Sequence, residues 1–290
     1  MLSIAQPSSL QKQYVFYGSL AAKQIRTKFI NPAMRKHAMT LYFIGIGLCD
    51  EKDITVRGLE AVKKCDYVYL EKYTSILQCP IERLEELYHK KIILADRELV
   101  ERRAYEILED AKDRNAAFLV IGDIFGATTH TDLMLRAKEK DVHCEYIHNA
   151  SILNAIGIVG LELYKYGKVT SIPFSTESFK PETPYDVIKM NRVAGLHALV
   201  LLDLRPDENR FMTVNNAIQY LLHIEHNRKE NVFTEETICI GCARIGCKDF
   251  IIKAGKAKDL LHEDFGGPLH CMIIPGTMHF IEEEALKQWE

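Results

Sequence analysis

The chain has no long apolar run and no clustered cysteine framework. Its longest stretch without a charged residue, 265–281, contains two prolines and three glycines. A membrane-spanning helix needs about 20 mostly apolar residues, so no span is predicted. The eight cysteines are scattered through apolar segments. This distribution is typical of buried thiols in a reducing compartment and not of a disulfide-stabilised secreted domain.

A metal site is considered at Cys239-x-x-Cys242, which Cys247 follows. The surrounding segment, 237–243, is predicted to be a strand, and residues three apart on a strand face opposite sides. Both thiolates could not then reach one zinc ion, so the pattern favours structural cysteines and we predict no metal.

Acidic residues are absent from the first 39 positions, which carry six basic ones. Residues 40–290 therefore hold 31 basic and 40 acidic residues, a net charge of −9. A basic, acid-free leader is compatible with an organellar transit peptide. We favour instead a disordered, non-essential extension ahead of Met39. The acidic remainder argues against nucleic acid as a partner.

The order of expected elements predicts an α/β protein. Through residue 150, strands at 41–46, 67–70, 91–94, 117–121 and 143–147 alternate with helices at 55–65, 80–88, 97–113 and 129–140, as in a mostly parallel sheet covered by helices. Later elements are a helix at 151–166, strands at 169–174, 198–204, 237–243 and 271–274, and helices at 185–194, 213–228 and 280–288. Their wider spacing predicts a mixed sheet. We expect domains at 40–150 and 151–290 after the extension 1–39.

Two glycine loops lie at strand ends. The first loop, Gly45-x-Gly47, would need a third glycine at position 50 to form a dinucleotide-binding motif. Asp50 stands there, so a dinucleotide-binding site is excluded. The strand before Gly122-Asp123 leads through Gly126 to a helix, an arrangement that places a ligand at the carboxyl edge of a parallel sheet. Because a carboxylate repels phosphate, a ligand with hydroxyl and amino groups fits better.

These loops belong to a set of segments that resemble the diphthine synthase family, tetrapyrrole-methylase-like (class III) methyltransferases. The segments are 41–55, 69–77, 95–101, 118–133, 146–157, 212–222 and 265–274, in family order. GATTHTDL, HNASI and the PLH element are particular to this family within its superfamily. The resemblance implies two α/β domains with a cofactor cleft between them, in a tetrapyrrole methylase-like fold.

The resemblance also implies a function and a site. The expected activity is methylation of the 3-amino-3-carboxypropyl-histidine of elongation factor 2 in diphthamide biosynthesis, with S-adenosyl-L-methionine as the cofactor. Three N-methylations are expected, and a fourth as an ester in the eukaryotic branch. A cytoplasmic homodimer is expected. The cofactor contacts carried over are Leu48, Asp123, Gly126, Ser151, Ile152, Leu202, Ile245 and His270.

Each carried-over residue also has a purely structural interpretation. Asp123 is suited to accept hydrogen bonds from ligand hydroxyls or an ammonium, or to cap a turn. Ser151 is a natural N-cap, whereas Leu202 and Ile245 on their own would be assigned to the core. A lone histidine such as His270 is more often structural than catalytic.

The acceptor side is less defined. Thr128, Thr129, His130, Arg244 and the segment 73–75 are candidates to line it. No catalytic base is predicted, because a free α-amino group has a pKa of about 7.7–8.0 and is partly neutral at pH 7.

Departures from the family pattern leave alternatives open. Ile124 stands where proline is usual, which could loosen the loop that holds Asp123, and the connection 205–210 is short where many eukaryotic members carry an insertion. The alternatives are a non-catalytic S-adenosylmethionine sensor and a corrin-type small-molecule methylase.

Overall fold

The computed structural model describes residues 39–176 and 181–290, which fall in one compact unit. The predicted disordered extension lies outside these residues, Met39 excepted. Two five-stranded sheets organise the described chain, the first within residues 40–147 and the second within 170–274. Over the described ranges, no helix is both long and apolar enough to cross a membrane.

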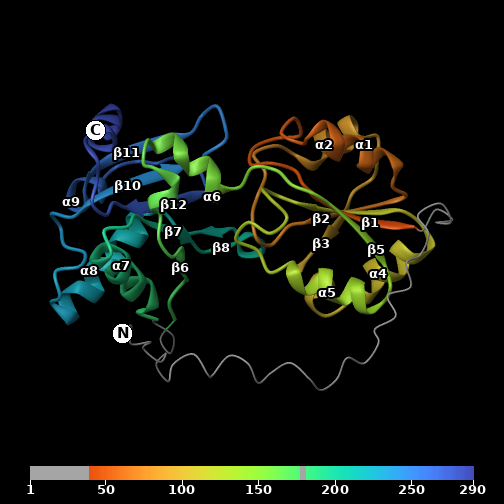
Figure 1. The fold of residues 1–290 in the computed structure, drawn as a ribbon, viewed down its shortest axis with the longest axis horizontal. Helices are drawn as coiled ribbons and strands as arrows, with labels where there is room; N and C mark the ends of the chain where they lie inside the picture. Colours follow the sequence, from red (N-terminus) through yellow and green to blue (C-terminus); the bar gives the residue numbers. More distant parts are fainter. Residues whose placement is uncertain (1–38, 177–180) are drawn as a thin grey trace, which may run out of the picture. The chain divides into compact units, whose positions relative to one another are not determined.

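The first sheet is parallel, in the order β3-β2-β4-β1-β5. Its strands are β1 (Thr40–Gly45), β2 (Tyr67–Glu71), β3 (Ile93–Ala95), β4 (Ala116–Val120) and β5 (His143–Ile147). The central strand β4 is buried at every residue, because helices cover both faces of the sheet. Helices α1 (Val56–Lys64) and α2 (Ile81–Tyr88) pack on one face. Helices α3 (Arg97–Glu101), α4 (Ala104–Asp113) and α5 (Thr131–Glu139) pack on the other (Figure 1).

The second sheet is mixed, as predicted, in the order β11-β10-β12-β7-β6. Only β6 (Thr170–Ile172) and β7 (Ala198–Leu202) are parallel; β10 (Ile238–Ala243), β11 (Ile251–Lys256) and β12 (His270–Ile274) run antiparallel to their neighbours. Helices α7 (Thr183–Val193), α8 (Val214–Arg228) and α9 (Ala257–Leu260) cover one face. The other is covered by α6 (Ile152–Ala155), the 3₁₀ helix η2 (Ile156–Val159) and α10 (Phe280–Leu286), which continues into η5 (Lys287–Trp289). A ribbon of β8 (Leu204–Arg205), η4 (Pro206–Glu208) and β9 (Arg210–Phe211) follows β7.

Two helix predictions are wrong. The segment 97–113 forms two helices, α3 and α4, separated at residues 102 and 103. The predicted helix 151–166 is broken into α6, η2 and the 3₁₀ helix η3 (Leu163–Lys165). Gly160 ends η2: it has a φ of 97°, and a Cβ there would lie 2.5 Å from the Ala285 side chain of α10. The backbone turns at this glycine to let α10 pack closely.

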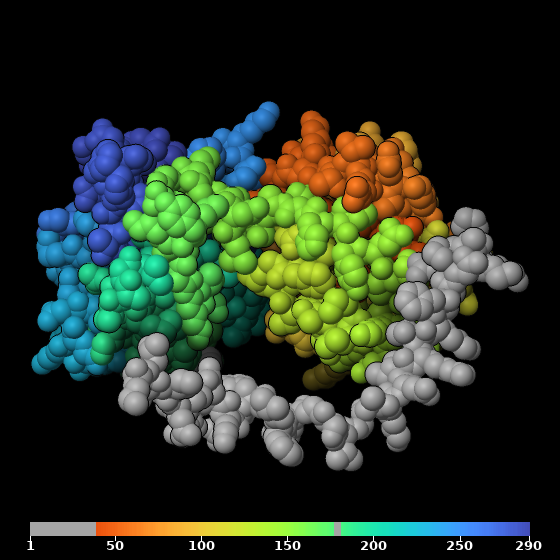
Figure 2. All heavy atoms as spheres, viewed as in Figure 1, coloured from red at the N-terminus to blue at the C-terminus, as the bar shows by residue number. Residues whose placement is uncertain are grey.

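The expectation of free thiols is wrong for two cysteines. Cys49, in the loop after β1, and Cys247, in the loop after β10, form a disulfide with Cα atoms 5.1 Å apart. In Figure 2 the blue segment near residue 247 accordingly lies against the orange segment near residue 50. No local pattern could indicate this pair, because 198 positions separate the two residues. Cys239 and Cys242 do lie on opposite faces of β10, as predicted, and pack in different core clusters.

Candidate active site

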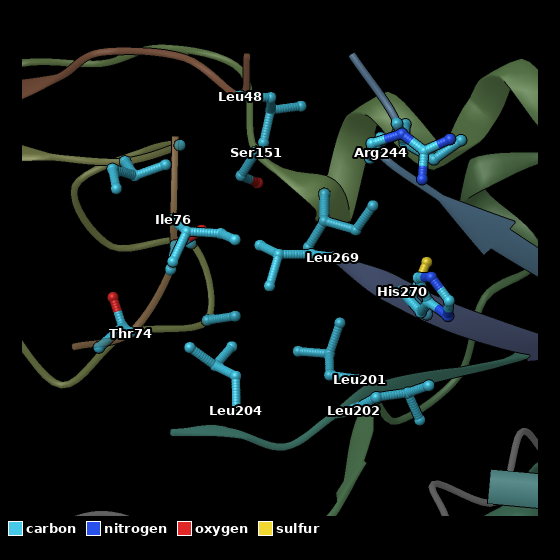
Figure 3. Close-up of a pocket in the computed structure, with 18 of the residues that line it drawn as sticks. Leu48, Thr74, Ile76, Ser151, Leu201, Leu202, Leu204, Arg244, Leu269 and His270 are labelled. Atoms are coloured by element: carbon cyan, nitrogen blue, oxygen red, sulfur yellow. The ribbon is translucent and has the colours of Figure 1, made fainter. Parts of the chain in front are cut away.

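A cavity lies between the carboxyl edge of the first sheet and the adjoining strand ends of the second. It encloses about 920 Å³ of space, part of it open to solvent. The loops after β1, β2, β4 and β5 form one wall, and the ends of β7 and β10 with the start of β12 form the other. Figure 3 shows apolar side chains, Ile76, Leu201, Leu204 and Leu269, around the opening. We call this space the main cavity.

The loop after β1 is held in a tight turn. Gly47 has a φ of 82° and pairs with Gly122 of the loop after β4. The amides of Leu48 and Cys49 donate to Asp53 Oδ2 at 3.1 and 2.7 Å. Leu48 is thereby fixed with its side chain in the cavity wall.

Asp123 closes the turn after β4 and does not line the cavity. Its carboxylate accepts from the amide of Phe125 at 3.0 Å, the amide of Asn149 at 3.1 Å and Nδ1 of His148 at 2.8 Å. Partial burial raises the pKa of Asp123, but these three donors outweigh it and the pKa falls below its ordinary value. Ile124, next to it, is fully buried, so the loop is anchored on both sides.

Gly126 and Ser151 bring two loops into contact at the cavity wall. A Cβ on Gly126 would lie 2.7 Å from Cβ of Ser151, so only glycine permits this approach. Ser151 caps α6: its hydroxyl accepts from the Leu153 amide at 3.3 Å, and its own amide donates to Asn154 Oδ1 at 2.8 Å. The capping interpretation of Ser151 is therefore correct, and the residue also lines the cavity.

His270 opens β12 with both ring nitrogens occupied. Nδ1 accepts from the Val214 amide at 3.3 Å, so Nε2 carries the proton and donates to the carbonyls of Gly266 and Gly267 at 3.2 and 3.1 Å. Burial lowers the pKa of His270. A neutral ring with no free nitrogen supplies a shaped wall and is not available as a general base.

The guanidinium of Arg244 is likewise committed within the protein. It donates to the Asp249 carboxylate at 2.7 Å, to the Asp249 carbonyl at 2.8 Å and to the Phe265 carbonyl at 3.1 Å. These bonds join the loop after β10 to the chain preceding β12. Arg244 therefore shapes the cavity. Its candidate role was to bind a substrate carboxylate, and it is poorly placed to do so.

Comparisons with known proteins show the family of the chain. A family model for Tetrapyrrole (Corrin/Porphyrin) Methylases matches residues 40–261. A diphthine methyl ester synthase from Dictyostelium discoideum is 52% identical over 85% of this chain and 96% of its own length. The one from Homo sapiens is 48% identical, over 85% and 93%. The chain belongs to the diphthine methyl ester synthase family.

Solved structures place the fold in the same family. A candidate diphthine synthase from Entamoeba histolytica superposes with a TM-score of 0.81 at 48% identity, covering 87% of this chain and 98% of the other. A second diphthine synthase gives a TM-score of 0.79 at 36% identity, covering 86% and 95%. As a member of this family the chain is a methyltransferase with the predicted α/β fold. Relatives at 48–52% identity that are diphthine methyl ester synthases argue against the alternative of a corrin-type small-molecule methylase.

Most of the predicted cofactor contacts lie around one cavity. Seven line the main cavity: Leu48, Gly126, Ser151, Ile152, Leu202, Ile245 and His270. Asp123 stands behind the wall. Of the acceptor-side candidates, Thr74, Ser75, Thr128 and Arg244 line the cavity. His130 does not; it is buried against Phe118, with ring centroids 5.2 Å apart, and burial lowers its pKa to about 4.

Several lining residues carried no recognisable signal in the sequence. Leu204 and Leu269 are isolated leucines, and Cys242 and Cys271 are cross-strand partners on β10 and β12. Glu71 was also missed: the predicted strand ended at residue 70, whereas β2 includes Glu71, which is fully buried. Across the described ranges, no group of three or more His, Cys, Asp or Glu residues could hold a metal ion.

Proposed function

We propose that this chain transfers methyl groups from S-adenosyl-L-methionine to the 3-amino-3-carboxypropyl-histidine of elongation factor 2 in diphthamide biosynthesis. The observation that carries the proposal is the main cavity, where seven carried-over cofactor residues meet from loops of both sheets. The relatives' name, diphthine methyl ester synthase, supports a fourth methylation on the carboxylate after three on the amine.

The cavity fits the proposed cofactor. Leu202 and Ile245 offer apolar walls for an adenine ring, and the missing side chain at Gly126 lets the Ser151 loop close the wall beside them. Leu48 and Ile152 complete an apolar surround. Asp123 would act indirectly, by fixing the turn between Gly122 and Gly126. We propose further that residues 40–150 and 151–290 act as two domains on either side of the cofactor.

The chemistry follows from what these walls provide. The bound cofactor would supply an electrophilic sulfonium methyl group. The chain contributes orientation and exclusion of water, and orientation alone is worth roughly 7–11 kcal/mol in suitable reactions. No general base is needed, because an α-amino group with a pKa of about 7.7–8.0 is partly neutral at physiological pH. His270, with both nitrogens occupied, is consistent with a reaction that proceeds without one.

We also propose a homodimer that acts in the cytoplasm. Support for self-association comes from large apolar side chains on adjoining elements: Tyr164 of η3 is 80% exposed, and Phe280 and Ile281 of α10 are 69% and 58% exposed. The Lys165–Glu282 ion pair joins these two elements. In a reducing cytoplasm, Cys49 and Cys247 would be expected as a dithiol that closes on oxidation.

Mass spectrometry tests the proposed activity. Elongation factor 2 from cells that lack this methylation step is incubated with the protein and S-adenosyl-L-methionine. Gains of three or four methyl groups on the modified histidine are expected. If the mass stays unchanged while calorimetry shows that the cofactor binds, the enzyme assignment is wrong and the sensor alternative stands.

A further inference from the structure

A second cavity adjoins the main one. It encloses about 870 Å³, including space open to solvent, and is lined by the chain after β2, by Leu94 of β3 and by Pro206 and Asp207 of η4. We call it the side cavity. Ser75, Ile76 and Ile121 line both cavities. These three residues are therefore a shared partition, with the main cavity on one side and the side cavity on the other.

The strand order assigns different ends of the sheet edge to the two cavities. Most carried-over cofactor residues of the first half follow β1, β4 and β5, whereas the side cavity is built from residues at the ends of β2 and β3. The order β3-β2-β4-β1-β5 puts these groups at opposite ends of one edge. A donor at the β1 and β5 end leaves the β2 and β3 end for the molecule that receives the methyl group.

The partition is held in a defined conformation by Glu71. This fully buried carboxylate accepts from the amides of Tyr73 and Thr74 and from the Thr74 hydroxyl, each at 2.5 Å. The turn delivers Ser75 to the junction of the two cavities. Glu71 itself lines the side cavity, and its hydrogen bonds fix the turn that precedes Ser75.

The side cavity carries one available cation. Lys72 lines it and forms an ion pair with Asp207 at 3.4 Å, with side chains 39% and 68% exposed. Arg244, the other cationic residue of the two linings, is already committed to Asp249 and to backbone carbonyls. An exposed ion pair of this kind is weak, so an incoming carboxylate could displace Asp207 from Lys72 at little cost.

We propose that the side cavity is the entrance for the methyl acceptor, an amino-acid arm carried on a protein surface. The carboxylate of the arm pairs with Lys72 in place of Asp207, and its amino group reaches the Ser75 hydroxyl at the partition, facing the donor. This inference rests on the proposed function, because it requires an acceptor with both a carboxylate and an amine.

Opposite substitutions in the Lys72–Asp207 pair test the assignment. Lys72→Met removes the partner of the acceptor carboxylate and is expected to raise KM for elongation factor 2 by about tenfold. Asp207→Asn removes its competitor and is expected to lower KM by severalfold. Were the pair only structural, both substitutions would act in the same direction. Ser75→Ala is expected to lower kcat severalfold.

The controls separate this role from folding and from cofactor binding. Lys63→Met makes the same charge change on the exposed last turn of α1, which leads to the amino end of β2, and is expected to leave KM unchanged. All variants should keep the wild-type Tm and the wild-type Kd for S-adenosyl-L-methionine by calorimetry. Equal KM values, or a parallel change, in Lys72→Met and Asp207→Asn would overturn the assignment. Absence of turnover by the wild-type protein would instead contradict the proposed function, and this inference with it.

Discussion

The Cys49–Cys247 disulfide should contribute strongly to stability when it is closed. It links loops that belong to different sheets, across a sequence separation of 198 residues. Cross-linking so long a loop removes chain entropy from the unfolded state, which corresponds to about 5 kcal/mol at 25 °C as an upper value. Engineered and natural cases usually yield less, so we expect about 3–5 kcal/mol. For a chain of this size that is a difference in Tm of roughly 6–10 °C.

The assay is thermal and urea unfolding with and without a dithiol reductant, after peptide mapping has shown that the bond is closed. The wild-type protein should lose about 3–5 kcal/mol on reduction. A Cys49→Ser, Cys247→Ser double variant should start at the reduced value and ignore the reductant. Cys79→Ser, at a free and partly exposed cysteine, should behave as the wild type. The reasoning is refuted if the mapped disulfide can be reduced with no change in stability, or if the double variant responds to reductant as the wild type does.

Three further predictions concern the site and its support. Gly126→Ala places a methyl group 2.7 Å from Cβ of Ser151 and should weaken S-adenosyl-L-methionine binding by about tenfold or more in calorimetry. Gly255→Ala is the control, because the nearest atom to its new methyl group lies at 3.6 Å, and it should leave the affinity unchanged. Equal affinities in the two variants would contradict the steric argument. Glu282 is buried and partly desolvated, which raises its pKa, but its hydrogen bonds outweigh this and lower the pKa to about 2. The stability that ionised Glu282 contributes is therefore fully present above the unfolded-state pKa of about 4.3, and it is lost as the pH falls toward 2. Glu282→Gln should cost about 3–5 kcal/mol near neutral pH and flatten the acid limb of urea unfolding; a variant with the wild-type pH slope would speak against this. Because burial lowers the pKa of His270, its ring stays neutral from about pH 6.5 upward, and cofactor affinity should not titrate there; a titration that disappears in His270→Asn would show that the ring does gain a proton.

Local pattern predicted the first half of the fold well. All five strands expected before residue 150 are present, because a buried parallel strand such as β4 needs a continuous apolar run that is visible in the sequence. The second half followed less closely. Strand β11 escaped prediction because four of its six residues are Ala, Gly and two Lys, residue types that are depleted in strands.

The sequence by itself determined the family, the α/β alternation and the glycine turns that bring Leu48 and Gly126 to the cavity, since these depend on residues close together in the chain. Tertiary structure alone decided what depends on distant contacts. It ended η2 at Gly160 against Ala285, paired Cys49 with Cys247, and occupied both nitrogens of His270. The order of strands in the first sheet placed the side cavity beside β2 and β3. That order is fixed by which strands pair, and pairing is an interaction between segments that no local pattern records.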